Sequence, residues 1–188
     1  PSGDPCRARG PFWRAEPHPE HSGLFLYLNA DKRGIVLDLE AAADRRTLLD
    51  LCTAVDVVLE SFPPGELERR GLGFSALCAA NPRLVLVSVT PFGQTGPRSA
   101  WRGNDLIAFH SSGLAYGFPA LQVDGPDLAP LNAPSYAAAF LAGEMVASAA
   151  LHGMLVVQRS GRGCHLDLSL QEAVAAENQS QFSAFERS

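Results

Sequence analysis

The stretch RLVLVSVTPFGQTGP, Arg83 to Pro97, joins a continuous apolar run to a loop rich in glycine and proline. The run Arg83 to Val89 is typical of a strand that is buried on both faces of a parallel sheet. The loop Thr90 to Gly103 follows the carboxyl end of that strand, where open α/β sheets bind their ligands. This stretch therefore predicts a central strand that leads directly into a binding loop.

A second strand of the same kind lies upstream. Asp56 to Glu60 (DVVLE) is again continuously apolar. Between the two strands, a Pro63–Pro64–Gly65 breaker is followed by helical segments that Asn81–Pro82 ends. Strands that alternate with helices predict βαβ units with right-handed crossovers. We therefore predict an α/β fold, a Rossmann-like parallel sheet with flanking helices.

The same patterns predict the remaining elements. Gly34 to Leu39 (GIVLDL) is expected to form a strand, and Ala41 to Ala54 has apolar positions at helical spacing. Asn104 or Asp105 is expected to cap a further helix. Downstream we expect a Pro/Gly-rich loop over Gly117–Pro134, an apolar helix over Ala133–Val157, an alternating strand through Cys164, Leu166 and Leu168, and a helix to about Phe185.

Composition excludes several classes of protein. The formal charge is −5, and the basic residues, of which Lys32 is the one lysine, are dispersed, so a nucleic-acid partner is not expected. The four cysteines show no metal-ligand or disulfide spacing, and the five histidines show no metal spacing, which favours a reducing cytoplasm and no bound metal. Glu144 and His152 interrupt the longest apolar stretch, which argues against a membrane span. The Pro/Gly/Arg-rich beginning suggests a piece of a longer protein.

Charged side chains at strand ends and helix starts are candidates for chemistry. A carboxylate held above the sheet could act as a general acid or base, although capping explains such residues more often. Arg69 and Arg70 follow a strand end and could bind a phosphate with their guanidinium groups. The carboxylates in such positions are Asp38, Glu60, Asp105 and Asp167.

Six blocks, read in order, resemble the family III CoA-transferases, the CaiB/BaiF group that includes the α-methylacyl-CoA racemases. They are GDPCRARGPFW (3–13), LYLNADKRGIVLDLE (26–40), DVVLESFPPGELERRGLGFSAL (56–77), NPRLVLVSVTPFGQTGP (81–97), GNDLIAFHSSGLAYGF (103–118) and RSGRGCHLDLSLQEA (159–173). The resemblance implies that residues 1–188 are part of a large domain that lacks its first strand and the small domain. It also implies a homodimer with coenzyme A as a substrate held across the strand ends.

The family's CoA contacts can be carried over by position. They fall on Leu37 to Glu40, on Ser61 to Pro63, on Arg69 and around Arg102, so Leu37, Asp38, Ser61, Phe62, Arg69 and Arg102 are the expected CoA-binding residues. Phe62 would lie against the adenine, and Arg69 and Arg102 would neutralise phosphate. Two positions depart from the family pattern. Glu40 stands where lysine is frequent, and Pro63 replaces the arginine or other residue that is usual there.

The largest departure concerns the nucleophile. Family transferases use an aspartate four residues before a glycine, and its carboxylate attacks the acyl-CoA carbonyl. Counting back from RSGRG places that glycine at Gly143 and the nucleophile position at Ala139. Glu144, five positions beyond Ala139, would point to another side of a helix. Asp105 matches a family acidic position near the reacting group and is the expected catalytic carboxylate.

Several functions remain open at this point. The resemblance implies CoA transfer between an acyl-CoA and a carboxylic acid. Because Ala139 has no carboxylate, the chain could instead be a non-catalytic half that pairs with a competent paralogue. A racemase-like role would need a histidine where Asn104 stands. A dinucleotide-dependent oxidoreductase is disfavoured, since the chain has no G-x-G-x-x-G fingerprint.

Overall fold

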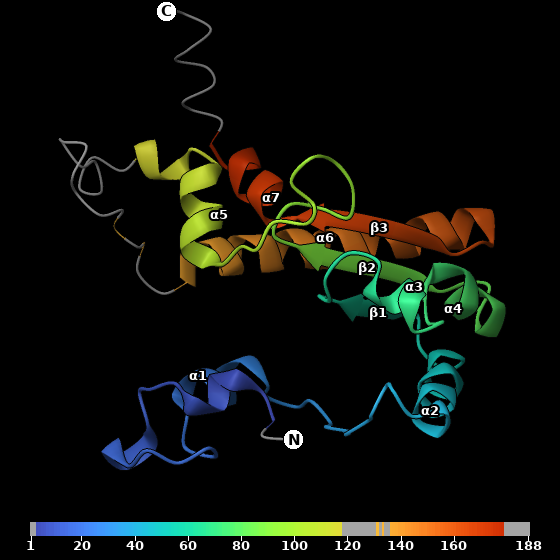
Figure 1. The fold of residues 1–188 in the computed structure, drawn as a ribbon, viewed down its shortest axis with the longest axis horizontal. Helices are drawn as coiled ribbons and strands as arrows, with labels where there is room; N and C mark the ends of the chain where they lie inside the picture. The colour runs from blue at the N-terminus through green and yellow to red at the C-terminus, as the bar shows by residue number, and fades with distance from the viewer. Residues whose placement is uncertain (1–2, 118–130, 132, 134–135, 179–188) are drawn as a thin grey trace, which may run out of the picture. The chain divides into compact units, whose positions relative to one another are not determined.

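The computed structural model describes residues 3–117, 131, 133 and 136–178. The chain divides into two compact units, residues 1–38 and 39–188, which are treated separately below. Figure 1 labels their helices and strands.

The first unit is a short helical segment built around a buried serine. Two 3-10 helices, η1 (Pro5–Ala8) and η2 (Trp13–Ala15), precede helix α1 (Gly23–Leu28). The Oγ atom of Ser22 lies 2.8 Å from the carbonyl oxygen of Cys6 and accepts a hydrogen bond from the amide of Phe25. The Arg7 guanidinium lies 3.7 Å from the centre of the Phe25 ring and pairs with Glu20. One serine thus joins η1 to the start of α1.

The strand predicted over Gly34–Leu39 is wrong. These residues form no helix or strand in the structure. The side chains of Ile35 and Val36 are 62% and 74% exposed, although a strand of a covered sheet would bury them. A β-branched run becomes a strand only when a neighbouring strand accepts its backbone hydrogen bonds, and no pairing partner is present for this run among the described residues.

The second unit contains the predicted parallel sheet. Strands β1 (Val57–Glu60), β2 (Val85–Thr90) and β3 (Cys164–Ser169) lie in the order β1-β2-β3, and both pairs are parallel. Strand β2 is the central one and is almost completely buried, as its continuous apolar run predicts. The α/β class and all three of these strands are confirmed.

Helices cover both faces of the sheet. On one face, α2 (Ala42–Cys52) and α4 (Phe74–Ala80) bury Cys52 and Leu77 against Leu84 and Leu86. On the other face, α6 (Ala137–Ser160) runs along β2 and β3, as Figure 1 shows. A third cluster, around Phe109, joins α5 (Asp105–Ser111) and α7 (Leu170–Ala176) to the beginning of α6. The short helices α3 (Glu66–Arg69) and η3 (Leu114–Gly117) complete this unit.

Two predicted helix boundaries differ from the structure. Helix α6 begins at Ala137 and not at Ala133, since Tyr136 has a φ of 56°, a left-handed conformation that a right-handed helix cannot include. It extends past Val157 to Ser160, where Gly161 (φ 72°) caps it and donates to the Val157 carbonyl. Helix α7 ends at Ala176; positions 179–185 of the predicted helix, and nearly all of the loop predicted over Gly117–Pro134, lie outside the described residues.

The turn between α6 and β3 requires a residue without a side chain. A Cβ atom on Gly163 would lie 2.3 Å from the carbonyl oxygen of Leu84, which is backbone and cannot move aside. We expect Gly163→Ala to lower the free energy of unfolding by about 2–3 kcal/mol through this overlap. Gly143→Ala is the matched control, because a Cβ there meets nothing within 4 Å and alanine favours a helix by about 0.5–1 kcal/mol. Urea denaturation of both variants measures the difference, and equal stabilities would contradict the packing of this turn.

Candidate functional site

The carboxyl ends of the three strands share one edge of the sheet. Because the strands are parallel, Glu60, Thr90 and Ser169 end at the same side, where open sheets bind ligands. Ser61 and Phe62 follow β1 directly, and both are exposed. The amide of Phe62 donates to Glu60 Oε2 at 2.8 Å. Two predicted CoA-binding residues therefore lie at the expected edge.

The glycine and proline loop after β2 is tied to both neighbouring strands. The Gln94 amide donates to Asp167 Oδ2 at 2.8 Å, and the Gln94 side chain lies 3.5 Å from Glu60 Oε1. Gly93 has a φ of 84° and passes close to the Asp167 carboxylate. Glu60 and Asp167, which the sequence left open as acid or base groups, are thus engaged in holding this loop.

Arg69, the predicted phosphate ligand, lies in a cluster of four charged side chains. It donates to Glu66 through Nε at 3.0 Å and through Nη2 at 2.7 Å. Arg70 contacts Glu66 Oε1, the oxygen that also accepts from Arg69 Nη2. The Oε1 atom of Glu40 lies 3.7 Å from Arg69 Nη2 and 3.1 Å from Arg70 Nη2. The Arg69 side chain remains 60% exposed. It can therefore reach a phosphate in solvent, in competition with two carboxylates.

The two arginines make Glu66 an unusually strong acid. Their hydrogen bonds lower the pKa of Glu66 from 4.5 to about 2, and the same contact raises the pKa of Arg69. A depressed carboxyl pKa contributes stability that is present above pH 4.5 and is lost as the pH falls toward 2. We expect Glu66→Gln to be less stable than the unsubstituted chain at pH 7 and equal to it near pH 2. Urea midpoints across this range measure the gap, and a gap independent of pH would contradict the ion pairing.

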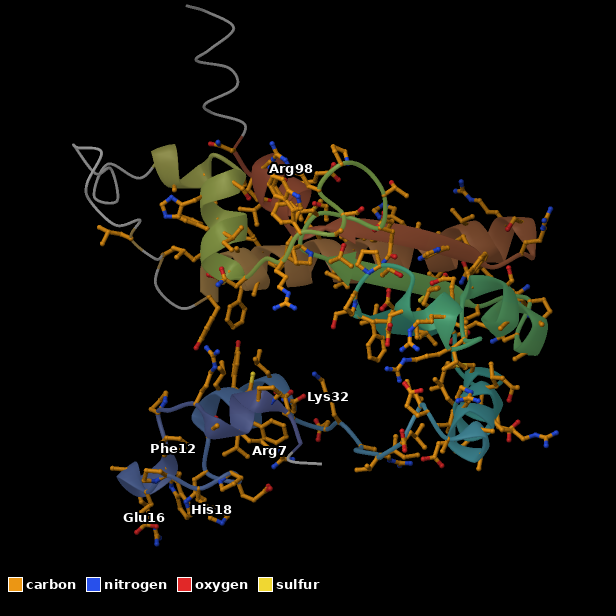
Figure 2. All side chains as sticks on the ribbon, viewed as in Figure 1. Arg7, Phe12, Glu16, His18, Lys32 and Arg98 are labelled. Carbon is orange, nitrogen blue, oxygen red and sulfur yellow. The ribbon has the colours of Figure 1, made fainter. Side chains whose placement is uncertain are left out.

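Arg102 lies at the end of the same loop, next to an aromatic cluster that the sequence did not single out. Arg102 is exposed. Trp101 is 59% exposed, packs edge-on against Phe92 with ring centres 5.9 Å apart, and has the Arg98 guanidinium 5.4 Å from its ring. Figure 2 shows Arg98 on this loop. Arg98 and Trp101 are three residues apart in this loop, a spacing that does not by itself predict their contact.

Asp105 and Ala139 lie together, although 34 residues separate them in the sequence. The Ala139 amide, in the first turn of α6, donates to Asp105 Oδ1 at 2.8 Å. Asp105 Oδ2 is buried and has no hydrogen-bond partner among the described residues. Asn104 caps α5, as predicted, by accepting a hydrogen bond from the Ile107 amide at 3.0 Å. The expected catalytic carboxylate and the expected nucleophile position are therefore neighbours.

The chemistry available at position 139 is limited by its side chain. Ala139 is exposed and presents only a methyl group. Glu144 is also exposed, but five residues along a helix rotate it about 140° away from Ala139. Leu37 and Asp38 belong to the first unit, so their approach to the sheet edge stays a prediction.

The histidines of the described segments have packing or backbone partners. His165 Nε2 lies 2.8 Å from Ser88 Oγ and its ring stacks on Phe74. His110 Nε2 lies 2.8 Å from the Leu131 carbonyl oxygen, and His18 and His21 pack together in the first unit. Within the part of the chain that the structure describes, no three His, Cys, Asp or Glu side chains gather as metal ligands would.

Curated proteins that resemble this chain include several CoA-transferases. The chain is 39% identical over 97% of its length to the succinyl-CoA:(R)-benzylsuccinate CoA-transferase subunit BbsE of Thauera aromatica. It is 33% identical over 93% of its length to the acetyl-CoA:oxalate CoA-transferase of Acetobacter aceti. These matches cover 44% and 42% of the two relatives, so the chain spans less than half of their length.

Solved structures agree with this grouping. A CaiB/BaiF family protein from Brucella suis superposes with a TM-score of 0.85 at 28% identity, over all of this chain and 48% of that protein. A variant of Rv3272 from Mycobacterium tuberculosis, in which one aspartate is replaced by alanine, gives 0.82 at 26% identity, over all of this chain and 49% of that protein. The family profile of CoA-transferase family III matches residues 1–186. The chain therefore belongs to CoA-transferase family III.

Proposed function

We propose that this chain binds acyl-CoA as part of a CoA-transferase and that another polypeptide supplies the attacking carboxylate. The observation that carries this proposal is Ala139, which stands exposed at the position where the family pattern places the nucleophile. The relatives' names support CoA transfer as the reaction class. The free cysteines Cys6, Cys52, Cys78 and Cys164 are compatible with the reducing cytoplasm that we propose as its location.

The CoA molecule is proposed to lie along the strand-end edge. Phe62 offers an exposed ring for the adenine next to β1, and Arg69 and Arg102 offer exposed guanidinium groups for the phosphates. The exposed Trp101 lies beside Arg102 and extends the same loop. Leu37 and Asp38 are proposed as further CoA-binding residues. The thioester would then point toward the first turn of α6.

The transfer reaction explains why the side chain at 139 matters. A carboxylate oxygen attacks the thioester carbonyl, the carbon–sulfur bond breaks, and CoA leaves as a thiolate from a mixed anhydride. The thiolate then attacks the enzyme carbonyl of that anhydride, which releases the first acid and leaves CoA on the carboxylate. The second acid then runs these two steps in reverse. Its carboxylate attacks the enzyme thioester and displaces CoA as a thiolate, and the thiolate attacks the acyl carbonyl of the new anhydride, which gives the new acyl-CoA and frees the enzyme carboxylate. A methyl group has no electron pair for the first attack, so Ala139 cannot begin this sequence.

Asp105 is proposed to position the first turn of α6. Its Oδ1 atom accepts the Ala139 amide, which fixes the backbone at the reacting position. A second candidate function follows from Oδ2, which has no hydrogen-bond partner among the described residues: Asp105 would itself be the attacking carboxylate of a homodimer. Asp105→Asn separates the two roles: it keeps an oxygen for the Ala139 amide and removes the nucleophilic carboxylate. Loss of all turnover with unchanged stability would favour the second candidate.

A partner subunit is the natural source of the missing group. The relative BbsE is itself named as a subunit. We propose that the full protein pairs with a paralogue that carries aspartate at the position of Ala139. A racemase-like role has less support, because the Asn104 amide caps α5 and does not take up protons at neutral pH.

The test is to tag the full protein in its own cells and to analyse what co-purifies. We expect a second CoA-transferase polypeptide with an aspartate aligned to Ala139, together with a rise in melting temperature of the isolated protein on addition of CoA. Robust transferase turnover by the lone homodimer would contradict the proposal. No thermal shift at millimolar CoA would contradict binding.

A further inference from the structure

Two loops at the carboxyl edge of the sheet carry residues that are proposed to bind CoA, and both loops contact the same carboxylate. The loop after β1 holds Phe62, the proposed adenine platform, and the loop after β2 leads to Arg102, a proposed phosphate ligand. Glu60 is the last residue of β1. Its Oε2 atom accepts the Phe62 amide at 2.8 Å, and its Oε1 atom lies 3.5 Å from the side-chain nitrogen of Gln94. One carboxylate thus joins the two loops.

Gln94 is held in this place by its own backbone. Its amide donates to Asp167 Oδ2 at 2.8 Å, so the residue is tied to β3 while its side chain reaches the end of β1. Gly93 permits this approach, because its φ of 84° is a left-handed conformation and a Cβ atom there would lie 3.5 Å from Asp167 Oδ2. Gln94 therefore connects both outer strands across the end of β2.

The loop after β2 is closed at its base. The Pro91 carbonyl oxygen accepts the Gln171 amide at 3.1 Å, which ties the start of the loop to α7. A Cβ atom on Gly103 would lie 2.4 Å from the Cβ atom of Pro91, so the two ends of the loop meet. The backbone of Arg102 is next to Gly103 and is therefore held at this base. Gln94 is the contact that relates this loop to the loop after β1.

The two carboxylates that Gln94 contacts are satisfied by neutral donors. Glu60 and Asp167 are both in register with Ser88, so they lie on one face of the sheet with Cα atoms about 10 Å apart. Neither carboxylate forms an ion pair within the described residues. A neutral amide at position 94 therefore suits this place, whereas a carboxylate there would be repelled by Glu60.

We propose that Gln94 is a positioning residue for CoA, which acts by orienting the Glu60 carboxylate that fixes the Phe62 backbone. It would thereby set the distance between the adenine platform and the phosphate ligand Arg102, and a ligand that binds two points at once gains affinity when their separation is fixed in advance. This inference rests on the proposed function, since it concerns the same CoA site. Glu60 then serves as a second positioning residue and not as a general acid or base.

Gln94→Glu tests this role, because its effect on CoA binding should depend on pH. At low pH the carboxyl groups at positions 94 and 60 share a proton and keep a hydrogen bond, whereas at higher pH both ionise and repel each other. We expect the full protein with this substitution to bind CoA within about twofold of the unsubstituted protein at pH 5 and about tenfold more weakly at pH 8. Calorimetric titration with CoA measures the affinities, and the unsubstituted protein at each pH accounts for titration of the phosphates of CoA.

Glu60→Gln in the Gln94→Glu background should restore the affinity at pH 8. The amide at position 60 then donates to the carboxylate at position 94, while its oxygen still accepts the Phe62 amide. Thr95→Glu is the matched control, since it adds the same charge at an exposed position next to Gln94. Glu60→Gln should not recover any affinity that Thr95→Glu loses, because long-range repulsion of the CoA phosphates does not depend on the contact between positions 94 and 60.

Four results would overturn the proposal: unchanged affinity of Gln94→Glu at pH 8, a loss that is independent of pH, no recovery with Glu60→Gln, or equal recovery of Thr95→Glu. Thermal unfolding at both pH values shows whether each variant is folded. If Gln94→Glu unfolds at pH 8, Gln94→Met removes the donor at similar side-chain length, and CoA affinity equal to that of the unsubstituted protein would overturn the proposal. No CoA binding by the unsubstituted protein would instead contradict the proposed function itself, and this inference with it.

Discussion

Ala139→Asp is expected to raise CoA transfer by the isolated full protein by about two orders of magnitude, because it places a carboxylate at the proposed nucleophile position. The position is exposed in the first turn of α6, so the larger side chain meets no core. The start of α6 carries the positive end of the helix dipole, which favours a negative charge in this turn. Initial rates with an acyl-CoA donor and an acid acceptor measure the gain.

Ala139→Asn is the matched control for that gain. Asparagine has the shape of aspartate and lacks the nucleophilic oxygen, so its rate should stay at the background of the unsubstituted protein. Both variants should unfold within about 0.5 kcal/mol of the parent, as exposed substitutions usually do. Equal rates for the two variants would place the reacting carboxylate elsewhere and would contradict the assignment of position 139.

Arg69→Gln is expected to weaken CoA binding by about tenfold and to reduce its salt dependence. The substitution removes the exposed guanidinium that is proposed to contact phosphate, and charge-assisted contacts of this kind are the ones that salt screens. Calorimetric titration with CoA at two salt concentrations measures both effects. A dissociation constant unchanged at low salt would remove Arg69 from the binding site.

Removing the charge of Glu40, in the same cluster, should have the opposite effect on CoA affinity. Its carboxylate lies 3.7 Å from Arg69 and competes with a phosphate, so Glu40→Gln should tighten CoA binding about threefold at low salt. Arg70→Gln is the control for general disruption of the cluster. Arg70 is only 19% exposed and contacts Glu66 and Glu40, so its loss should affect stability more than CoA affinity.

The sequence was sufficient for the parts of the fold that depend on local pattern. Strand β2 is a continuous apolar run because helices cover both of its faces, and burial of this kind is visible in composition. Gly34–Leu39 has a similar composition but forms no strand, since strand formation depends on a neighbour that local sequence does not specify. Helix α6 begins at Ala137 and not at the predicted Ala133, because the backbone of Tyr136 has a left-handed conformation.

The site required the structure. The contact between the Ala139 amide and Asp105 spans 34 residues, and no spacing rule predicts it. The pairing of Arg69 with Glu66 could be read from helical spacing, but the approach of Glu40 from before α2 could not. Resemblance to the family identified the candidate site residues in the sequence. The structure shows which of them are in contact, as Asp105 and Ala139 are.

Mass spectrometry of the two intact polypeptides after acyl-CoA treatment would test the central claim most directly. The full protein, purified with its partner, is incubated with an acyl-CoA. Borohydride then reduces an enzyme thioester to an alcohol and hydroxylamine converts it to a hydroxamate; each releases CoA and leaves a mass change on the carboxylate that reacted. We predict that the adduct appears on the partner and that the polypeptide carrying Ala139 keeps its mass. An adduct on this polypeptide, mapped to Asp105 or to any other of its carboxylates, would contradict the account.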